Sequence, residues 1–159
     1  MEAVKTIIIT GGGGHLGRSV ARWWAKPGTQ LVLIDRDAER LDKSRADLSP
    51  LSASLTLIAA DVAVPDEIAA AAASLPASLW SGPPSLVLAH AVSGKGAGAK
   101  SAQLGDMDHD QWRHVLDVNL TSAVFTIQGF LPYMKKAGGG RSSLMMMRPA
   151  FLTCSSEQE

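Results

Sequence analysis

The sequence predicts an α/β fold in which a parallel sheet lies between two layers of helices. Short apolar runs at residues 4–9 and 29–34 have the length of buried strands, and each precedes a segment with helical spacing. The same alternation returns further along, with strand-like runs at 55–60 and 86–89. Such repetition indicates right-handed βαβ units and a doubly wound, three-layer arrangement.

Capping and turn residues mark the expected helices. The first helix carries Trp23 and Trp24, which we expect to pack in the core or in an interface. The second is predicted over residues 38–48. Pro65 suits the first turn of the third. A capping-box pattern at Asp108 opens a long helix, which the glycines at 138–140 end.

A glycine-rich turn joins the first strand to the first helix and reads Thr-Gly-Gly-Gly-Gly-His-Leu-Gly. Glycine permits positive φ angles and lets a phosphate approach the bare backbone, while the helix directs its N–H groups at that phosphate. Strand, glycine turn and helix in this order favour a nucleotide pyrophosphate site over a merely structural loop. Gly11, Gly14, Leu16 and Gly17 are predicted to hold the pyrophosphate, and Thr10 and His15 are further candidates for cofactor binding.

Asp35 directly follows the second strand, near the spacing expected for a carboxylate that binds the adenosine ribose hydroxyls. Because a carboxylate there repels a 2′-phosphate, it favours NAD. The neighbouring Arg36 is suited to hold such a phosphate, so NADP is the alternative cofactor. Asp35 or Asp37 can instead be the N-cap of the second helix, and Asp37 suits that position better.

Two further strand ends are predicted to reach the cofactor, since ligands of open parallel sheets lie beyond the carboxyl ends of the strands. Asp61 can accept a hydrogen bond from the adenine amino group, and the Val62 N–H can reach the adenine ring; a simple turn is the alternative. Ala89 and Ala91 would leave room for the ribose and nicotinamide. His90 is either a ligand contact or, as we favour, a partly buried ring bonded to backbone.

Composition limits the remaining classes. The 159 residues, 46% of them hydrophobic, suit one domain with a substantial core. Fifteen basic and fifteen acidic residues cancel, which gives no reason to expect nucleic acid or a membrane as partner. The single cysteine, Cys154, excludes an internal disulfide and suits the cytoplasm. No metal site is predicted.

From Lys5 to about Arg141 the chain resembles the short-chain dehydrogenase/reductase family. The resemblance rests on the glycine turn, Asp35, Asp61-Val62, the strand end at 86–91 and Asp117-Val-Asn-Leu120. It implies a Rossmann-type fold, a nicotinamide cofactor and hydride transfer with a small alcohol or carbonyl substrate. By the resemblance, Asn119 is the helix asparagine that shapes the active site; a structural asparagine bonded to backbone is the alternative.

Several positions depart from the family pattern. His15 stands where the single-domain branch has its second glycine, and the spacing of Gly11, Gly14 and Gly17 is closer to that of sugar-nucleotide epimerases. The family's Tyr-x-x-x-Lys pair, which supplies the general acid or base, is absent. The only tyrosine is Tyr133, and Ala137 stands where the lysine would be.

The segment after Arg141 allows two alignments. Without a gap, the family's serine pair falls on Met146 and Met147, and the remaining residues are unrelated sequence from a frameshift or alternative splice. With an insertion, Ser155 or Ser156 becomes the candidate catalytic serine, although an exposed terminal serine is the simpler interpretation. Residues 1–141 are therefore expected to form the dinucleotide-binding domain and 142–159 a divergent or truncated tail, with the last strands lacking.

Three functions remain open. The first is the cofactor-binding part of an oxidoreductase that is catalytically incomplete by itself. The second is a non-catalytic NAD-binding or regulatory protein. The third is an unstable truncated product. The helix from Asp110 to Lys136 has an apolar surface too wide for one sheet contact, which makes it a candidate homodimer face.

Overall fold

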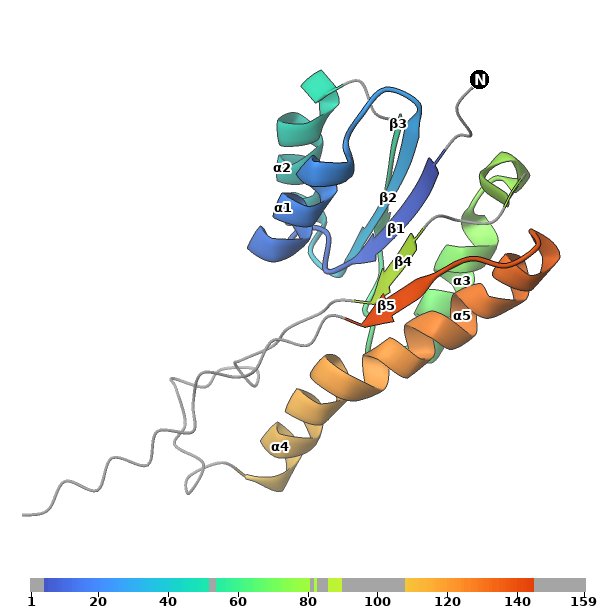
Figure 1. Cartoon of the computed structure of the whole chain (residues 1–159). Helices are drawn as coiled ribbons and strands as arrows, with labels where there is room; N and C mark the ends of the chain where they lie inside the picture. The colour runs from blue at the N-terminus through green and yellow to red at the C-terminus, as the bar shows by residue number, and fades with distance from the viewer. Residues whose placement is uncertain (1–4, 52–53, 81, 83–85, 90–107, 145–159) are drawn as a thin grey trace, which may run out of the picture.

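The computed structural model describes residues 5–51, 54–80, 82, 86–89 and 108–144 (Figure 1). In this part of the chain, five strands form one parallel sheet in the order β3-β2-β1-β4-β5. The strands are β1 (Lys5–Thr10), β2 (Thr29–Asp35), β3 (Ser54–Ala59), β4 (Leu86–Ala89) and β5 (Ser142–Leu144). The chain order reverses between β1 and β4, which is the switch point of a doubly wound sheet. The predicted fold class is confirmed.

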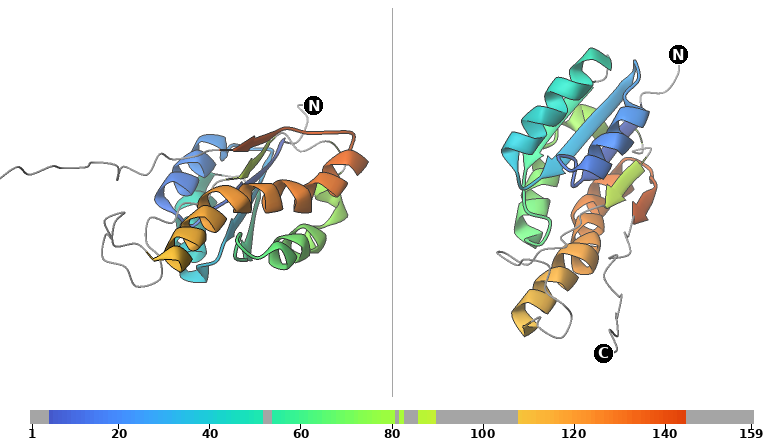
Figure 2. Two further views of the ribbon diagram at one scale, coloured as in Figure 1. Left: turned by 90° about the horizontal axis from the view of Figure 1, so that it is seen from below. Right: turned by 90° about the vertical axis from the view of Figure 1, so that its left-hand side faces the viewer.

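Helices cover both faces of the sheet. One face carries α1 (His15–Trp24) and α2 (Ala38–Leu48), and the other carries α3 (Pro65–Ser74) and α5 (Ser122–Lys136) (Figure 2). The helix α4 (His109–Leu116) leads into α5. This placement follows from right-handed crossovers that run in opposite directions on the two sides of the switch point.

Alternate residues of the strands pack into two separate hydrophobic cores, one on each face of the sheet. In β1, Ile7 and Ile9 pack with residues of α1 and α2, whereas Ile8 packs with residues of α3 and α5. All three isoleucines are fully buried. This explains the continuous apolar runs in the sequence, because a parallel strand covered on both faces has no polar side.

Most predicted boundaries agree with the structure. The second helix spans the predicted residues, and Asp37 is its N-cap, with the side chain accepting from the Arg40 N–H at 3.1 Å. Pro65 is the first residue of α3, and Asp108 forms a full capping box with Gln111. The third strand begins and ends one residue earlier than predicted, at Ser54 and Ala59.

Two expectations need adjustment. Trp24 packs against the core, whereas Trp23 is 73% exposed with the Lys26 Nζ atom 5.8 Å from its ring centroid. Of the two places expected for Trp23, the core is therefore excluded and the interface stays a prediction. The long helix is not regular, because a π-helical turn, Asp117–Thr121, separates α4 from α5.

The sheet extends into the segment expected to be a tail. β5 runs parallel to β4, with Val87 opposite Ser142 and Ala89 opposite Leu144. Its three residues therefore belong to the folded sheet, even though they lie beyond the predicted boundary at Arg141.

Candidate functional site

The glycine turn is held at the carboxyl end of β1 by backbone contacts. Gly11 has φ +65°, a conformation that L side chains rarely adopt. The Gly12 N–H donates to the Ile34 carbonyl at 3.0 Å, and the Gly14 N–H donates to the Gly11 carbonyl at 3.0 Å. A Cβ atom on Gly17 would collide with the Gly11 backbone. The glycines thus allow a tight turn against the first turn of α1.

The N-terminus of α1 has the form of an anion site. Its N-cap is Gly14, and no side chain caps it. The first N–H groups of a helix lack partners within the helix and carry the positive end of the dipole. His15 at the start of α1 is exposed, whereas Thr10 at the end of β1 is only 1% exposed. These backbone groups can bind a phosphate without side-chain help.

Asp35 ties the end of β2 to the glycine turn. Its Oδ2 atom accepts from the Gly13 N–H at 3.0 Å, and its Oδ1 atom accepts from the Asp37 N–H at 3.1 Å. Because each carboxylate oxygen can accept more than one hydrogen bond, the half-buried carboxylate retains acceptor capacity. It is a rigidly held acceptor beside the turn, as a ribose ligand requires.

Asp61 lies two residues beyond β3 and shapes the next loop. Its Oδ1 atom accepts from the Ala63 N–H at 2.9 Å, which is the turn role considered as the alternative. Its Oδ2 atom lies 4.0 Å from the Arg36 Nη1 atom. The Val62 side chain is buried in the core, so only its backbone could face a ligand.

The end of β4 lies beside the end of β1. Leu88 pairs with Ile9, and Ala89 is the last residue of the strand. Ala89 therefore lies at the carboxyl-terminal end of the strands, as does the glycine turn. The candidates His90, Ala91 and Ser155 fall outside the described residues.

Asn119 lies in the middle of the π-helical turn. Its Nδ2 atom donates to the Val115 carbonyl at 2.7 Å, so its amide is engaged with backbone, as the structural interpretation expects. Figure 1 shows α4 and the start of α5 at the sheet end where the strands finish. π-Helical turns inside α-helices are frequent at functional sites. The turn thus brings Asn119 to the same end of the molecule as the glycine turn.

Tyr133 lies at the other end. Its ring stacks on Trp80, with 5.2 Å between centroids and an interplanar angle of 27°. The short helical turn that ends in Trp80 also bonds to the start of β1, where the Thr6 Oγ1 atom donates to the Leu79 carbonyl at 3.4 Å. The chain's only tyrosine is therefore a partly buried residue that packs against the core, remote from the glycine turn.

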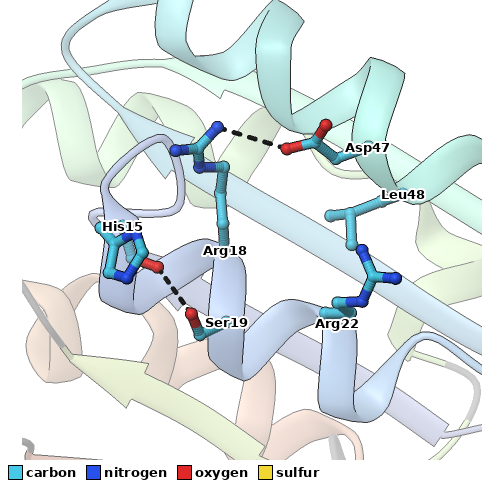
Figure 3. Close-up of a pocket in the computed structure, with 6 residues that line it drawn as sticks. All are labelled: His15, Arg18, Ser19, Arg22, Asp47 and Leu48. Carbon is cyan, nitrogen blue, oxygen red and sulfur yellow. Dashed lines mark hydrogen bonds and ion pairs between the residues drawn. The ribbon is translucent and has the colours of Figure 1, made fainter.

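A hollow of about 190 Å³ lies between α1 and α2 (Figure 3). The Arg18 Nη1 atom pairs with the Asp47 Oδ2 atom at 3.2 Å across it. Six residues line it: His15, Arg18, Ser19, Arg22, Asp47 and Leu48. It shares only His15 with the predicted cofactor residues, so it is a surface feature beside that site.

Sequence reasoning missed Gly13 and Glu67. Gly13 donates the hydrogen bond that positions Asp35, and Glu67 accepts from the Asp61 N–H at 2.7 Å through Oε2. The signal for Glu67 was its place in the first turn of α3, where an acidic side chain can reach back to free N–H groups. No comparable signal distinguished Gly13 among four consecutive glycines.

These features define a class of protein. A doubly wound parallel sheet, a glycine turn at its switch point and an acidic residue after β2 make up the Rossmann fold. The model of the short chain dehydrogenase family matches residues 5–142. The chain belongs to the short-chain dehydrogenase family.

Its relatives in sequence are roughly twice as long. The chain is 34% identical over 136 residues to the oxidoreductase asL5 of Sarocladium schorii, covering 86% of this chain and 51% of the relative. It is also 34% identical over 140 residues to the D-beta-hydroxybutyrate dehydrogenase of Rhizobium meliloti, again covering 86% and 51%. This chain thus spans about half the length of these relatives.

Solved structures support the fold. NAD+-bound xylitol dehydrogenase matches with a TM-score of 0.77 and 23% identity over 89% of this chain and 52% of that one. The L-sorbose reductase of Gluconobacter frateurii, complexed with NADPH and L-sorbose, matches with a TM-score of 0.74, 24% identity and the same coverage.

Proposed function

We propose that this chain binds NAD as the cofactor-binding portion of a short-chain oxidoreductase, and that it turns over no substrate by itself. The observation that carries the proposal is the bond between Asp35 and Gly13. It joins a ribose-type acceptor to the uncapped start of α1, so one rigid unit offers groups for both the pyrophosphate and the ribose.

The described residues fit the dinucleotide. The backbone of Gly11, Gly14, Leu16 and Gly17 would hold the pyrophosphate, and Asp35 would hold the adenosine ribose. Asp61 and the Val62 N–H would face the adenine. When bound, the nicotinamide accepts or gives up a hydride. A small alcohol or carbonyl compound would be the substrate of a longer parent.

The catalytic step lacks its proton donor in this chain. Tyr133 is partly buried, stacks on Trp80 and has no lysine four residues later. β5 begins directly after Arg141, which supports the ungapped alignment. Under that alignment the serine positions are Met146 and Met147. We therefore assign Asn119 a supporting role and Ser155 none.

The half-length match supports two connected proposals. Residues 1–141 would form the cofactor domain of a short-chain oxidoreductase, with β5 adding three residues of the following segment to its sheet. If the chain functions in this form, it would be a non-catalytic NAD-binding protein.

None of the helices in the described ranges is both long and apolar enough to cross a membrane. We place the protein in the cytoplasm because its single cysteine suits a reducing compartment.

An exposed apolar stripe supports a homodimer through the helix from Asp110 to Lys136. Five residues on it are large, hydrophobic and at least one third exposed: Trp112, Leu116, Leu120, Val124 and Leu131. At one end of the helix pair Asp108, Asp110 and Asp117 outnumber Arg113, which pairs with Asp110, and Lys135 and Lys136 lie at the other end. An antiparallel copy would therefore set opposite charges side by side, as a two-fold interface allows.

Calorimetric titration combined with a turnover assay tests this function. We expect NAD to bind saturably and no NADH absorbance to appear with D-3-hydroxybutyrate or xylitol, the alcohols named in the similar enzymes. Nicotinamide mononucleotide, which lacks the adenosine half, should bind more weakly than NAD. Absence of NAD binding would overturn the proposal, and NADH formation would overturn the part that denies turnover.

A further inference from the structure

One ion pair bridges the loops that follow β2 and β3. The Arg36 Nη1 atom lies 4.0 Å from the Asp61 Oδ2 atom, and the two side chains are 60% and 31% exposed. Since β2 and β3 are neighbours in the sheet, the ion pair lies at the carboxyl-terminal ends of these two strands. The adenosine half of a dinucleotide is proposed to bind there.

Arg36 is the side chain best placed to attract a 2′-phosphate, because it follows Asp35 in the chain. A guanidinium at this point accommodates the extra phosphate of NADP. In the structure, however, its charge is directed toward Asp61 on the neighbouring loop. The arginine that would recognise NADP is thus already paired with a carboxylate.

The second arginine nearby is also paired. Arg40 Nε lies 3.0 Å from Asp37 Oδ2 at the start of α2. Around this edge, four carboxylates face two guanidinium groups: Asp35, Asp37, Asp61 and Glu67 against Arg36 and Arg40. A 2′-phosphate, with about −1.5 to −2 charges at neutral pH, would enter surroundings with an excess of negative charge.

We propose that Asp61 is a specificity-determining residue that acts through Arg36: it holds the guanidinium toward β3 and thereby disfavours a 2′-phosphorylated dinucleotide. The inference rests on the proposed binding of NAD at this edge. Asp61 is a positioning residue in this role, in addition to its proposed contact with adenine. NADP must compete with Asp61 for Arg36, whereas NAD need not.

The substitution Asp61→Asn separates this role from the turn. Asparagine retains an Oδ1 atom for the Ala63 N–H, which Asp61 engages at 2.9 Å, but it removes the charge that holds Arg36. Any change in adenine binding affects NAD and NADP alike, because the two differ only in the 2′-phosphate. The ratio of the two dissociation constants therefore isolates the proposed effect.

The experiment measures the dissociation constants of NAD and NADP by calorimetry at low ionic strength, for the wild type, Asp61→Asn, Arg36→Gln and the double variant. We expect Asp61→Asn to shift the ratio toward NADP by about three- to fivefold, the size of an exposed ion pair. The shift should shrink at high salt. In the Arg36→Gln background, Asp61→Asn should shift the ratio by clearly less.

The outcomes are distinguishable. If the wild type binds neither dinucleotide, the proposed function fails and the inference fails with it. If both bind but Asp61→Asn leaves the ratio unchanged, the inference alone is overturned. An equal shift with and without Arg36 would also overturn it, because Asp61 would then act by direct repulsion. Equal weakening of both ligands would identify Asp61 as an adenine or turn residue only.

Discussion

The carboxylate of Asp35 and the backbone of Gly13 are joined by a hydrogen bond of 3.0 Å between Oδ2 and N. This contact connects residues far apart in sequence, one at the end of β2 and one in the turn after β1. It means that the shape of the phosphate turn and the position of the ribose acceptor depend on each other.

Replacing Asp35 should therefore weaken NAD binding and loosen the turn. Asp35→Ala removes the acceptor of the Gly13 and Asp37 N–H groups. Since hydrogen bonds to a charged group contribute about 1.5–3 kcal/mol, we expect NAD affinity to fall at least about tenfold. Calorimetric titration checks this. Asp35→Asn is the matched control and should lose less, and equal affinity in all three proteins would contradict the proposed role.

The packing of Gly17 predicts a stability effect. Gly17→Ala would drive a Cβ atom into the Gly11 backbone, at a cost of about 1–3 kcal/mol. Urea unfolding followed by circular dichroism measures the loss. Gly82→Ala is the control, because a Cβ there meets nothing within 4 Å. Similar stability for both variants would show that the turn is less tightly packed than the structure indicates.

The cap of α2 gives a second contrast in stability. Asp37→Ala removes the acceptor of the Arg40 N–H and should cost about 1 kcal/mol. Asp47→Ala removes only a surface ion pair with Arg18 and should change the free energy of unfolding by less than about 0.5 kcal/mol. The same urea assay compares them. A larger loss at Asp47 would contradict the ranking.

The apolar stripe predicts a change in oligomeric state. Leu120, 47% exposed at the centre of the helix pair, should lie inside the proposed two-fold interface. Leu120→Glu would place two like charges close together there and should convert dimer to monomer in analytical ultracentrifugation. Lys43→Glu, at an exposed position of α2 on the opposite face of the sheet, should leave the dimer intact. A wild-type monomer at all concentrations would refute the interface.

Much of the fold follows from local signals. The strands β1 and β2 follow from apolar runs that are buried on both faces, and the starts of α2, α3 and α4 follow from Asp37, Pro65 and Asp108. These residues act through bonds within a few positions, so the sequence alone reveals them. The π-helical turn around Asn119 was not predictable in this way, since it carries no local residue signature.

Only the parts of the candidate site that carry a local sequence signal could be predicted. The glycine turn and Asp35 are recognisable by spacing, but their mutual hydrogen bond depends on how β1 and β2 lie side by side. The Arg36–Asp61 pair likewise depends on the adjacency of β2 and β3. Helical periodicity left the core and an interface open for Trp23, because it does not show which side of a helix remains exposed in the single chain.

The central claim is that NAD binds at the glycine turn and Asp35. Amide chemical-shift mapping by NMR on a chain of 16.7 kDa tests it most directly. On addition of NAD, the account predicts the largest shifts at Gly13, Gly14, Leu16 and Asp37, with little change at Lys135 at the far end of α5. Shifts concentrated instead at Ser19, Arg22 and Asp47, around the hollow between α1 and α2, or no shifts at all, would contradict it.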